Sequence, residues 1–132
     1  MAKKTNKQKL IAKMDKLWSM KVRESGRCAV CGLKYGLEAH HLIPRGNHLF
    51  RYELNNGICL CKSCHTYGAD ISAHGRKGSS MYAGEQFISW LRDEKPDQWK
   101  WYQENKHIKV TGTLYIADYE DMYEKLKGNN DG

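Results

Sequence analysis

The sequence predicts an α+β fold in which helices surround a small sheet. Two short strand-like segments, 37–43 (LEAHHLI) and 57–61 (GICLC), are framed by two C-x-x-C pairs, and helical stretches precede and follow them. A chain of 132 residues is long enough for one hydrophobic core and too short for two. We therefore expect a single domain with appendages: a basic N-terminal helix (1–27), a core (28–80), and a C-terminal extension of helices and a short strand (81–132).

The first expected element is an amphipathic helix in the N-terminal segment. Thr5 is suited to cap its start, and Gly26 lies just beyond its end. Its apolar side chains recur at steps of three and four residues and form one stripe, which must dock on the rest of the protein. The stripe consists of Leu10, Ile11, Met14, Leu17 and Trp18.

The positive charge of the chain is concentrated in this helix. Residues 1–27 contain nine Lys and Arg against two acidic residues, whereas residues 28–132 contain 13 of each sign. A basic segment on a neutral body favours a polyanion such as DNA as partner, because neutralising phosphates releases condensed counterions. The alternative is a solvated, lysine-rich helix that only aids solubility.

Five cysteines lie within 37 residues, and they favour a zinc site. Cys28 and Cys31 form one C-x-x-C pair, and Cys61 and Cys64 form another, with 29 residues between the pairs. Such spacing offers four thiolates tetrahedrally to one structural Zn²⁺. A redox-active C-x-x-C is the alternative, and an odd number of cysteines without an expected export signal argues against disulfides. We expect the fifth, Cys59, to be a buried apolar residue.

Four further helices and one strand or hairpin are expected from residue 62 onward. They are a helix beginning over 62–67, helices over 83–94 and 96–106, a strand or hairpin over 107–116, and a helix over 118–127. Pro96 suits the first turn of a helix. Asp118 is expected to cap the last helix, which Gly128 would end. The helix over 83–94 is expected to bury Phe87, Ile88, Trp90 and Leu91.

Histidines cluster in the same region as the cysteines. Five of the six lie between residues 40 and 74, and His40 and His41 are adjacent on an expected strand, where neighbouring side chains point in different directions. One imidazole can then hold a metal ion while the other acts as general base on a water molecule. The alternative is a pair of half-exposed histidines without a chemical role. We leave His48 and His107 as surface histidines.

Two further residues follow the histidine pair in the same region as the cysteine pairs. Asn56 lies 15 residues after His41, and His65 lies nine residues after Asn56. With the motifs CAVCG, AHHLIPR and NGICLCKSCH, the segment 28–74 resembles the HNH nuclease family. Its ββα-metal site is a two-stranded ribbon and a helix around a divalent ion. The longer stretch that runs on into FISWL is similar to small HNH proteins encoded by bacteriophages.

The resemblance implies a role for each matching residue. His40 and His65 would hold a catalytic Mg²⁺ or Mn²⁺. His41 would be the general base, and Asn56 would brace the ribbon and orient that base. The zinc ion of the cysteines would be structural and the second ion catalytic.

The third ligand of the catalytic ion is left open. Some family members carry a second helix histidine at a position where this chain has Ala69. His74, with Asp70 behind it, is one candidate for the ligand, and a water molecule is the other. His74 could equally be an exposed loop histidine.

The implied activity is metal-assisted hydrolysis of a DNA phosphodiester bond that leaves a 5′ phosphate and a 3′ hydroxyl. Basic residues near the site would contact backbone phosphate, although each could equally be a solvated charge. They are Arg45, Arg51, Lys62, Arg76 and Lys77. The alternative function is a zinc-stabilised DNA-binding or adaptor module without catalysis, which would not need the His and Asn residues in register. Sequence specificity, nicking or double-strand cutting, and oligomeric state are left open.

Location and partners follow from the same features. No apolar run approaches the ~20 residues of a membrane span, and lysines interrupt the N-terminal segment, so neither membrane insertion nor secretion is expected. We expect a cytoplasmic protein, in the host cytoplasm if it is phage-encoded. DNA is the expected partner, with a phage terminase or another phage DNA-processing protein as a further one. Packaging, recombination, host DNA breakdown and homing are all compatible roles.

Overall fold

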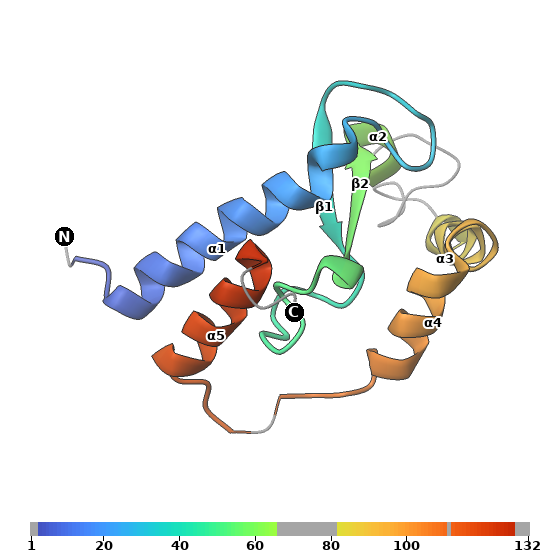
Figure 1. Ribbon diagram of the computed structural model, residues 1–132. Helices are drawn as coiled ribbons and strands as arrows, with labels where there is room; N and C mark the ends of the chain where they lie inside the picture. Colours follow the sequence, from blue (N-terminus) through green and yellow to red (C-terminus); the bar gives the residue numbers. More distant parts are fainter. Residues whose placement is uncertain (1–2, 66–81, 111, 129–132) are drawn as a thin grey trace.

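The computed structural model describes residues 3–65, 82–110 and 112–128 of the chain (Figure 1). Its helices and strands are α1 Asn6–Val22, β1 Leu37–His41, β2 Gly57–Cys61, α2 Lys62–His65, α3 Tyr82–Glu94, α4 Pro96–Asn105 and α5 Ile116–Lys127. Single turns of 3-10 helix at Arg23–Ser25 and Leu54–Asn56 follow α1 and precede β2. The combination of helices with a two-stranded antiparallel sheet confirms the α+β class.

The two strands form an antiparallel ribbon at the centre of the molecule. Leu37 pairs with Cys61 at one end of the ribbon, and His41 pairs with Gly57 at the other. Because β2 runs directly into α2 (Figure 1), this register brings the start of α2 beside the start of β1. Side chains alternate between the faces of a strand, so His40 and His41 lie on opposite faces of the ribbon, and His40 is the more buried of the two.

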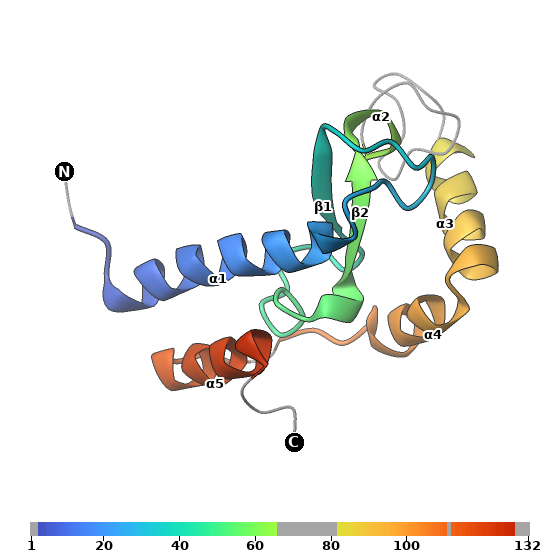
Figure 2. The ribbon, with the colours of Figure 1, turned by 45° about the horizontal axis from the view of Figure 1, so that its top comes forward.

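The expected N-terminal helix is present and docks through its apolar stripe. Thr5 caps α1: its hydroxyl oxygen accepts a hydrogen bond from the Gln8 amide, and Gln8 Oε1 accepts one from the Thr5 amide. Gly26 has the left-handed φ of 74° that suits the end of a helix. Figures 1 and 2 both show α1 lying beside α5 and against the ribbon. None of the helices in the described ranges combines the length and apolar character that a membrane crossing needs.

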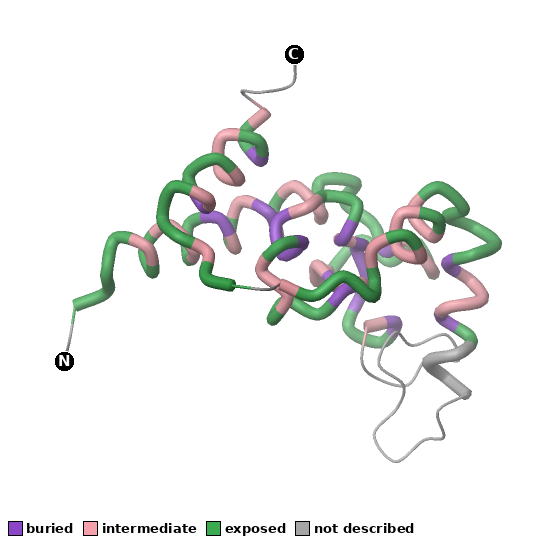
Figure 3. Tube along the Cα trace, turned by 90° about the horizontal axis from the view of Figure 1, so that it is seen from below, coloured by how far each residue is buried: buried purple, intermediate pink, exposed green. Residues whose placement is uncertain are grey.

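Two groups of buried side chains flank the ribbon. We call the first the ribbon half; its buried residues are Cys28, Ile58, Leu60, Cys61, Cys64, Phe87 and Leu91. We call the second the α1–α5 half; its buried residues are Met14, Trp18, Tyr52, Tyr119 and Leu126. Figure 3 shows buried positions on both sides of the molecule, with exposed positions on the outer surfaces of the helices. The ribbon therefore separates two small cores.

The strand or hairpin expected over 107–116 is not formed in the described residues, which corrects the prediction from the sequence. Apart from residue 111, which is not described, this segment is an irregular connection between α4 and α5. Ile108 is 38% exposed, and its carbonyl accepts a hydrogen bond from the Asn47 side chain at 2.8 Å instead of joining a sheet. Alternating apolar residues favour a strand only where a sheet edge is available to pair with them. The C-terminal extension is therefore helical without the expected short strand in its described part.

The last helix begins two residues earlier than expected. It starts at Ile116, so Asp118 lies in its first turn, and the Asp118 carboxylate accepts a hydrogen bond from the Tyr115 amide at 2.7 Å. Asp118 thus satisfies an amide at the helix start from inside the helix. The end of the helix is as expected, because Gly128 takes a left-handed φ of 88°.

Candidate active site and metal centre

Four cysteine side chains meet at the end of the ribbon. The sulfur atoms of Cys28, Cys31, Cys61 and Cys64 all lie within 4.8 Å of one another. Cys31 Sγ and Cys61 Sγ are 3.6 Å apart, close to the ~3.8 Å that separates sulfurs bound tetrahedrally to zinc at ~2.3 Å. The cluster is therefore compatible with a structural zinc ion.

Backbone hydrogen bonds shape the first cysteine pair into a tight turn. The Cys28 amide donates to the Leu33 carbonyl at 2.8 Å, and the Gly32 amide donates to the Cys28 carbonyl at 2.9 Å. Gly32 has a φ of 80°, which a residue with a side chain rarely adopts. The Ala29 amide donates to the Cys59 carbonyl and ties this turn to β2. The turn is thus attached to the strand that carries Cys61.

The surroundings of Cys28 favour the thiolate that a metal ion requires. Burial by itself raises the pKa of this thiol, but hydrogen bonds from the backbone of Cys31, Cys61 and Val30 outweigh burial and lower the pKa to about 7. Cys59 is different, because it is buried outside the four-cysteine cluster and burial raises the pKa of its thiol. The expectation of a buried, apolar Cys59 is confirmed.

His40 and His65 approach each other from two segments of the chain. Their ring centroids are 4.8 Å apart with an angle of 67° between the planes. His40 is buried, and its ring also lies edge-on to Phe87 of α3 at 5.7 Å. His65 directly follows Cys64 in α2, so the four-cysteine cluster positions the segment that presents it. Two imidazoles in this arrangement are suitable ligands for one divalent ion.

Glu38 orients the His65 ring. Its Oε1 lies 2.9 Å from His65 Nδ1. An ionised carboxylate only accepts hydrogen bonds, so Nδ1 carries the proton and Nε2 of a neutral ring has the lone pair that binds metal. Glu38 was not among the expected site residues. Its position two residues before His40, on the same face of β1, is the sequence signal that could have found it.

His41 is held by two contacts that the sequence did not reveal. Its Nε2 lies 3.0 Å from the Arg51 carbonyl oxygen, and its ring stacks on the Trp18 indole with 3.9 Å between centroids and 9° between planes. A carbonyl only accepts hydrogen bonds, so Nε2 carries the proton and Nδ1 of the neutral ring has the lone pair. Burial lowers the pKa of His41 and outweighs the hydrogen bond to the Arg51 carbonyl, which raises it; the positive charge of Arg51 acts in the same direction as burial. The ring is therefore neutral and able to accept a proton near pH 7.

Asn56 braces the loop that joins the two strands. Its side chain is completely buried; Oδ1 accepts from the Ile43 amide at 2.6 Å, and Nδ2 donates to the carbonyls of Ile43 and Phe50 at 3.0 and 3.1 Å. The hydrogen bonds of Asn56 within the described residues all go to this loop. Phe50 immediately precedes Arg51, whose carbonyl contacts His41. Asn56 therefore reaches His41 only through the backbone.

Arg51 is used inside the protein, which corrects the expectation that it contacts DNA phosphate. Its side chain is 10% exposed, and its Nε and Nη2 pair with the two carboxylate oxygens of Asp15 at 2.9 and 2.7 Å. Its Nη1 lies 3.4 Å from His48 Nε2, and His48 Nδ1 lies 2.9 Å from the Tyr119 hydroxyl. His48 is thus a half-buried member of a polar chain between α1 and α5, and the expectation of a surface histidine was wrong.

One cleft brings together the three candidate catalytic histidines, whereas Asn56 is absent from its lining. It has a volume of about 670 Å³ and is lined by His40, His41 and His65. Other residues that line it include Asp15, Trp18, Arg45, Phe87 and Tyr102. Arg45 is exposed at this cleft, and Lys62 is exposed at the start of α2. His74, Arg76 and Lys77, together with Ala69 and Asp70, lie outside the described residues.

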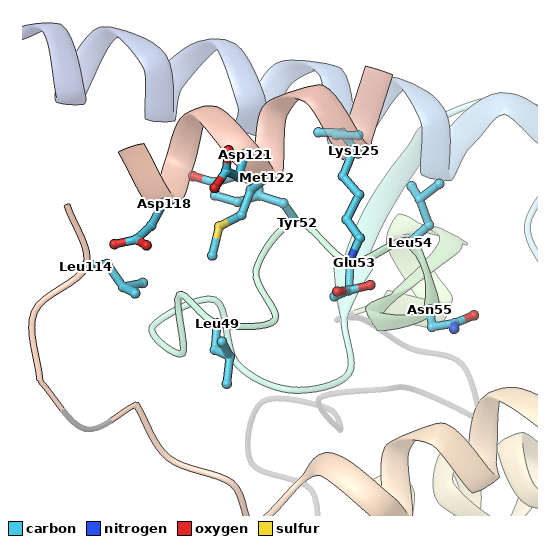
Figure 4. A pocket seen from close by; sticks show the side chains of 11 residues that line it. Leu49, Tyr52, Glu53, Leu54, Asn55, Leu114, Asp118, Asp121, Met122 and Lys125 are labelled. Atoms are coloured by element: carbon cyan, nitrogen blue, oxygen red, sulfur yellow. The ribbon is translucent and has the colours of Figure 1, made fainter. Parts of the chain in front are cut away.

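A second cavity has no comparable chemistry. It has a volume of about 650 Å³ and lies between α5 and the segment 49–55 (Figure 4). Figure 4 shows leucine and methionine side chains in its lining together with Glu53, Asp118, Asp121 and Lys125. Its lining contains neither histidine nor cysteine. We therefore place the candidate active site in the cleft around His41.

Comparison with known proteins supports this assignment. Residues 28–67 match the family model HNH_2, described as HNH endonuclease, and this confirms the resemblance inferred from the motifs. The matched segment contains both cysteine pairs together with His40, His41, Asn56 and His65. No curated protein and no solved structure was found to match the chain.

Proposed function

We propose that this protein, whose residues 28–67 match the HNH endonuclease family model, is a metal-dependent DNA endonuclease that hydrolyses phosphodiester bonds in the cleft around His41. The observation that carries the proposal is the hydrogen bond between His41 Nε2 and the Arg51 carbonyl. It assigns the lone pair to Nδ1 of an imidazole that shares a cleft with two convergent candidate metal ligands.

His41 would act as the general base. Its Nδ1 accepts a proton from a water molecule, and that water attacks the scissile phosphorus. The lowered pKa of His41, which results first from burial, keeps the ring neutral at cellular pH. The Arg51 carbonyl holds the tautomer required for this step.

His40 and His65 would hold the catalytic divalent ion, Mg²⁺ or Mn²⁺. When bound, this ion supplies positive charge that stabilises the pentacovalent transition state and the leaving 3′ oxygen. The short distance between the two rings and the hydrogen bond from His65 to Glu38 support this assignment. We propose His74 or a water molecule as the third ligand.

Positive charge around the cleft supports DNA as the substrate. Arg45 is exposed at the cleft and is proposed to contact a phosphate next to the cleaved bond. Lysines on the exposed face of α1 would add sequence-independent, salt-sensitive affinity. Lys62, Arg76 and Lys77 are proposed to extend the phosphate contacts.

A nicking assay tests the proposal. Supercoiled plasmid is incubated with wild type, His41→Ala or His107→Ala in Mg²⁺ or Mn²⁺ at several salt concentrations. His107 is exposed on the segment after α4 and serves as the matched control. Removing a general base lowers the rate by roughly 10²- to 10⁴-fold, so His41→Ala should be nearly inactive and His107→Ala should match wild type. Equal nicking by wild type and His41→Ala, or no nicking by wild type under any condition, would contradict a nuclease.

A zinc-stabilised DNA-binding or adaptor protein is the second candidate. The four-cysteine cluster and the exposed lysines of α1 favour it as much as they favour an enzyme. Such a protein would bind the plasmid with steep salt dependence and leave it intact. The nicking assay, run beside a binding assay with the same preparations, separates the two functions.

The source and partners of the nuclease stay predictions. The likeness to small phage HNH proteins suggests a terminase or another phage DNA-processing protein as partner. The genes next to its own and a map of its cleavage sites would distinguish packaging, recombination, host DNA breakdown and homing.

A further inference from the structure

We propose that Trp18 is a positioning residue for His41, so that α1 forms a wall of the active site in addition to carrying positive charge. The inference rests on the proposed nuclease function and assigns the orientation of its base to a helix outside residues 28–67. Trp18 lines the same cleft as His41 and is otherwise a buried member of the apolar stripe of α1.

The contacts of His41 restrain its ring in two independent directions. The hydrogen bond from Nε2 to the Arg51 carbonyl acts in the plane of the imidazole. The stacked indole of Trp18, 3.9 Å away and nearly parallel, covers one face and blocks rotation out of that plane. Both side-chain dihedral angles of His41 are thereby fixed. Either contact alone would leave one rotation open.

Trp18 is itself held in place on several sides. Its indole Nε1–H donates to the Glu53 carbonyl at 2.9 Å, and its side chain is 3% exposed. β2 passes so close to it that a Cβ atom at Gly57 would lie 2.7 Å from Trp18 Cζ2. A glycine at this position lets the strand approach the indole. The indole that supports His41 is therefore held by a hydrogen bond and by close packing.

A second residue of α1 reaches the other partner of His41. Asp15 lies three residues before Trp18, on the same side of the helix. Its carboxylate pairs with the Arg51 guanidinium through two hydrogen bonds, and the Arg51 carbonyl is the group that binds His41. The helix thus supports both restraints on the base, one directly and one through Arg51.

This arrangement couples DNA contact to alignment of the base. α1 is a single helix of 17 residues with exposed lysines on its outer side and Trp18 on its inner side. Removing Trp18 should therefore lower the chemical step more than it lowers DNA affinity. A purely structural tryptophan would change stability without a specific effect on the His41 ring.

The kinetic test compares Trp18→Leu and Trp18→Phe with Trp101→Leu. Trp101 is a tryptophan of α4 that packs edge-on against Phe50 and is absent from the lining of the cleft. With saturating Mn²⁺, we expect Trp18→Leu to lower kcat by ~10- to 100-fold, because a small displacement of a catalytic group has such an effect. KM for plasmid and the affinity for Mn²⁺ should change by less than about threefold. Trp18→Phe should give a smaller loss of kcat, and Trp101→Leu should keep the wild-type value.

The second readout follows the His41 ring itself and needs no catalysis. In ¹⁵N-labelled protein, the imidazole spectrum should show His41 as the Nε2–H tautomer, with ring protons shifted upfield by the indole face. Trp18→Leu should abolish the upfield shift, and it should give a mixture of tautomers because the ring, free to rotate, leaves the Arg51 carbonyl for part of the time. Trp18→Phe should reduce the shift, and Trp101→Leu should leave it unchanged. Thermal unfolding of all the variants shows which of them are folded.

The outcomes separate this inference from the proposed function. Wild-type kcat in Trp18→Leu, or an equal loss of kcat in Trp101→Leu, would overturn the positioning role while leaving the nuclease intact. A rise in KM without a fall in kcat would also overturn it. If Trp18→Leu does not fold, unchanged kcat and an unchanged His41 spectrum in Trp18→Phe would overturn it. Wild type that shows the stacked His41 ring but nicks no DNA counts against the nuclease instead.

Discussion

The ribbon half surrounds four cysteine thiols, whereas the α1–α5 half contains none of them in its buried core. The ribbon half is held by its cysteine cluster and a few apolar side chains. The α1–α5 half is held by aromatic packing and by the polar chain Asp15, Arg51, His48 and Tyr119. His41 lies on the strand between them and stacks on Trp18 of the second half. The proposed catalytic base therefore depends on a region that contributes none of the cysteines or histidines proposed as metal ligands.

The first prediction breaks the ribbon half by removing zinc. Cys28→Ser takes away one of the four cysteines proposed to bind a structural zinc ion, and such binding is worth about 10 kcal/mol or more in small zinc domains. This is comparable to the whole stability of a domain of this size. We expect the variant to lose zinc and cooperative unfolding, as measured by metal analysis and circular dichroism. Cys59→Ser changes a buried cysteine outside the cluster and should keep its zinc. A fully folded, zinc-free Cys28→Ser would show that the cluster is not structural.

The second prediction breaks the α1–α5 half and leaves zinc in place. Asp15→Ala leaves the Arg51 guanidinium, which is 10% exposed, without its carboxylate. Loss of one partner of a buried pair costs about 3–5 kcal/mol, and we expect about 2 kcal/mol here because Asp15 is 39% exposed. Urea unfolding measures this cost, and metal analysis should show unchanged zinc.

The exposed pair of Arg92 and Asp93 supplies the control for this prediction. Both side chains are more than half exposed, so Asp93→Ala should change the free energy of unfolding by less than about 0.5 kcal/mol. Equal effects of Asp15→Ala and Asp93→Ala would mean that the Arg51 pair does not stabilise the α1–α5 half.

The same division explains what the sequence could predict. The stripe of α1 and the two strands follow from local periodicity, and the cysteine cluster follows from residue type and spacing. The periodicity of a helix or strand can be read within a few neighbouring residues. The paired cysteines are informative because few structures other than a metal site or a redox site explain them. The Asp15–Arg51 pair joins residues 36 positions apart, and neither of them carries a sign of the other in its neighbourhood. An arginine near an expected nuclease site was therefore interpreted as a phosphate contact.

The site shows the same limit. The pair of histidines marked the region where a base and a metal ligand could lie, because adjacent residues of a strand face opposite ways. The tautomer of His41 depends on the Arg51 carbonyl, and backbone groups are the same in every sequence. Trp18, which stacks on His41, was predicted from the sequence only as one residue of the apolar face of a helix. The strand predicted after α4 was wrong for a related reason. Alternating apolar residues do not show whether another strand lies beside the segment to pair with it.

The third prediction sharpens the comparison within the ribbon half. Glu38→Gln keeps the size of the side chain that accepts a hydrogen bond from His65 but removes its charge. Loss of such an outer partner typically weakens metal binding by about 10- to 100-fold. Titration calorimetry with Mn²⁺ on the zinc-loaded protein measures the change, and zinc content should be unaffected. Glu53→Gln, which changes a carboxylate at the second cavity, is the control. Wild-type Mn²⁺ affinity in Glu38→Gln would remove His65 from the proposed ligand set.

The smallest expected effect concerns the pH dependence of the α1–α5 half. Burial lowers the pKa of His48, and the charge of Arg51 adds to this effect. The unfolded chain, with a histidine pKa near ~6.5, then binds more protons than the folded chain, so stability falls as the pH drops below that value. His48→Gln cannot titrate, and it should lose less stability than wild type between about pH 7.5 and pH 5.5, by under ~1 kcal/mol in urea unfolding. His107→Gln, at an exposed position, should keep the wild-type slope. If His48→Gln lost more stability than wild type over this pH range, the pKa of His48 would be raised on folding, and the folded state would favour the imidazolium beside Tyr119.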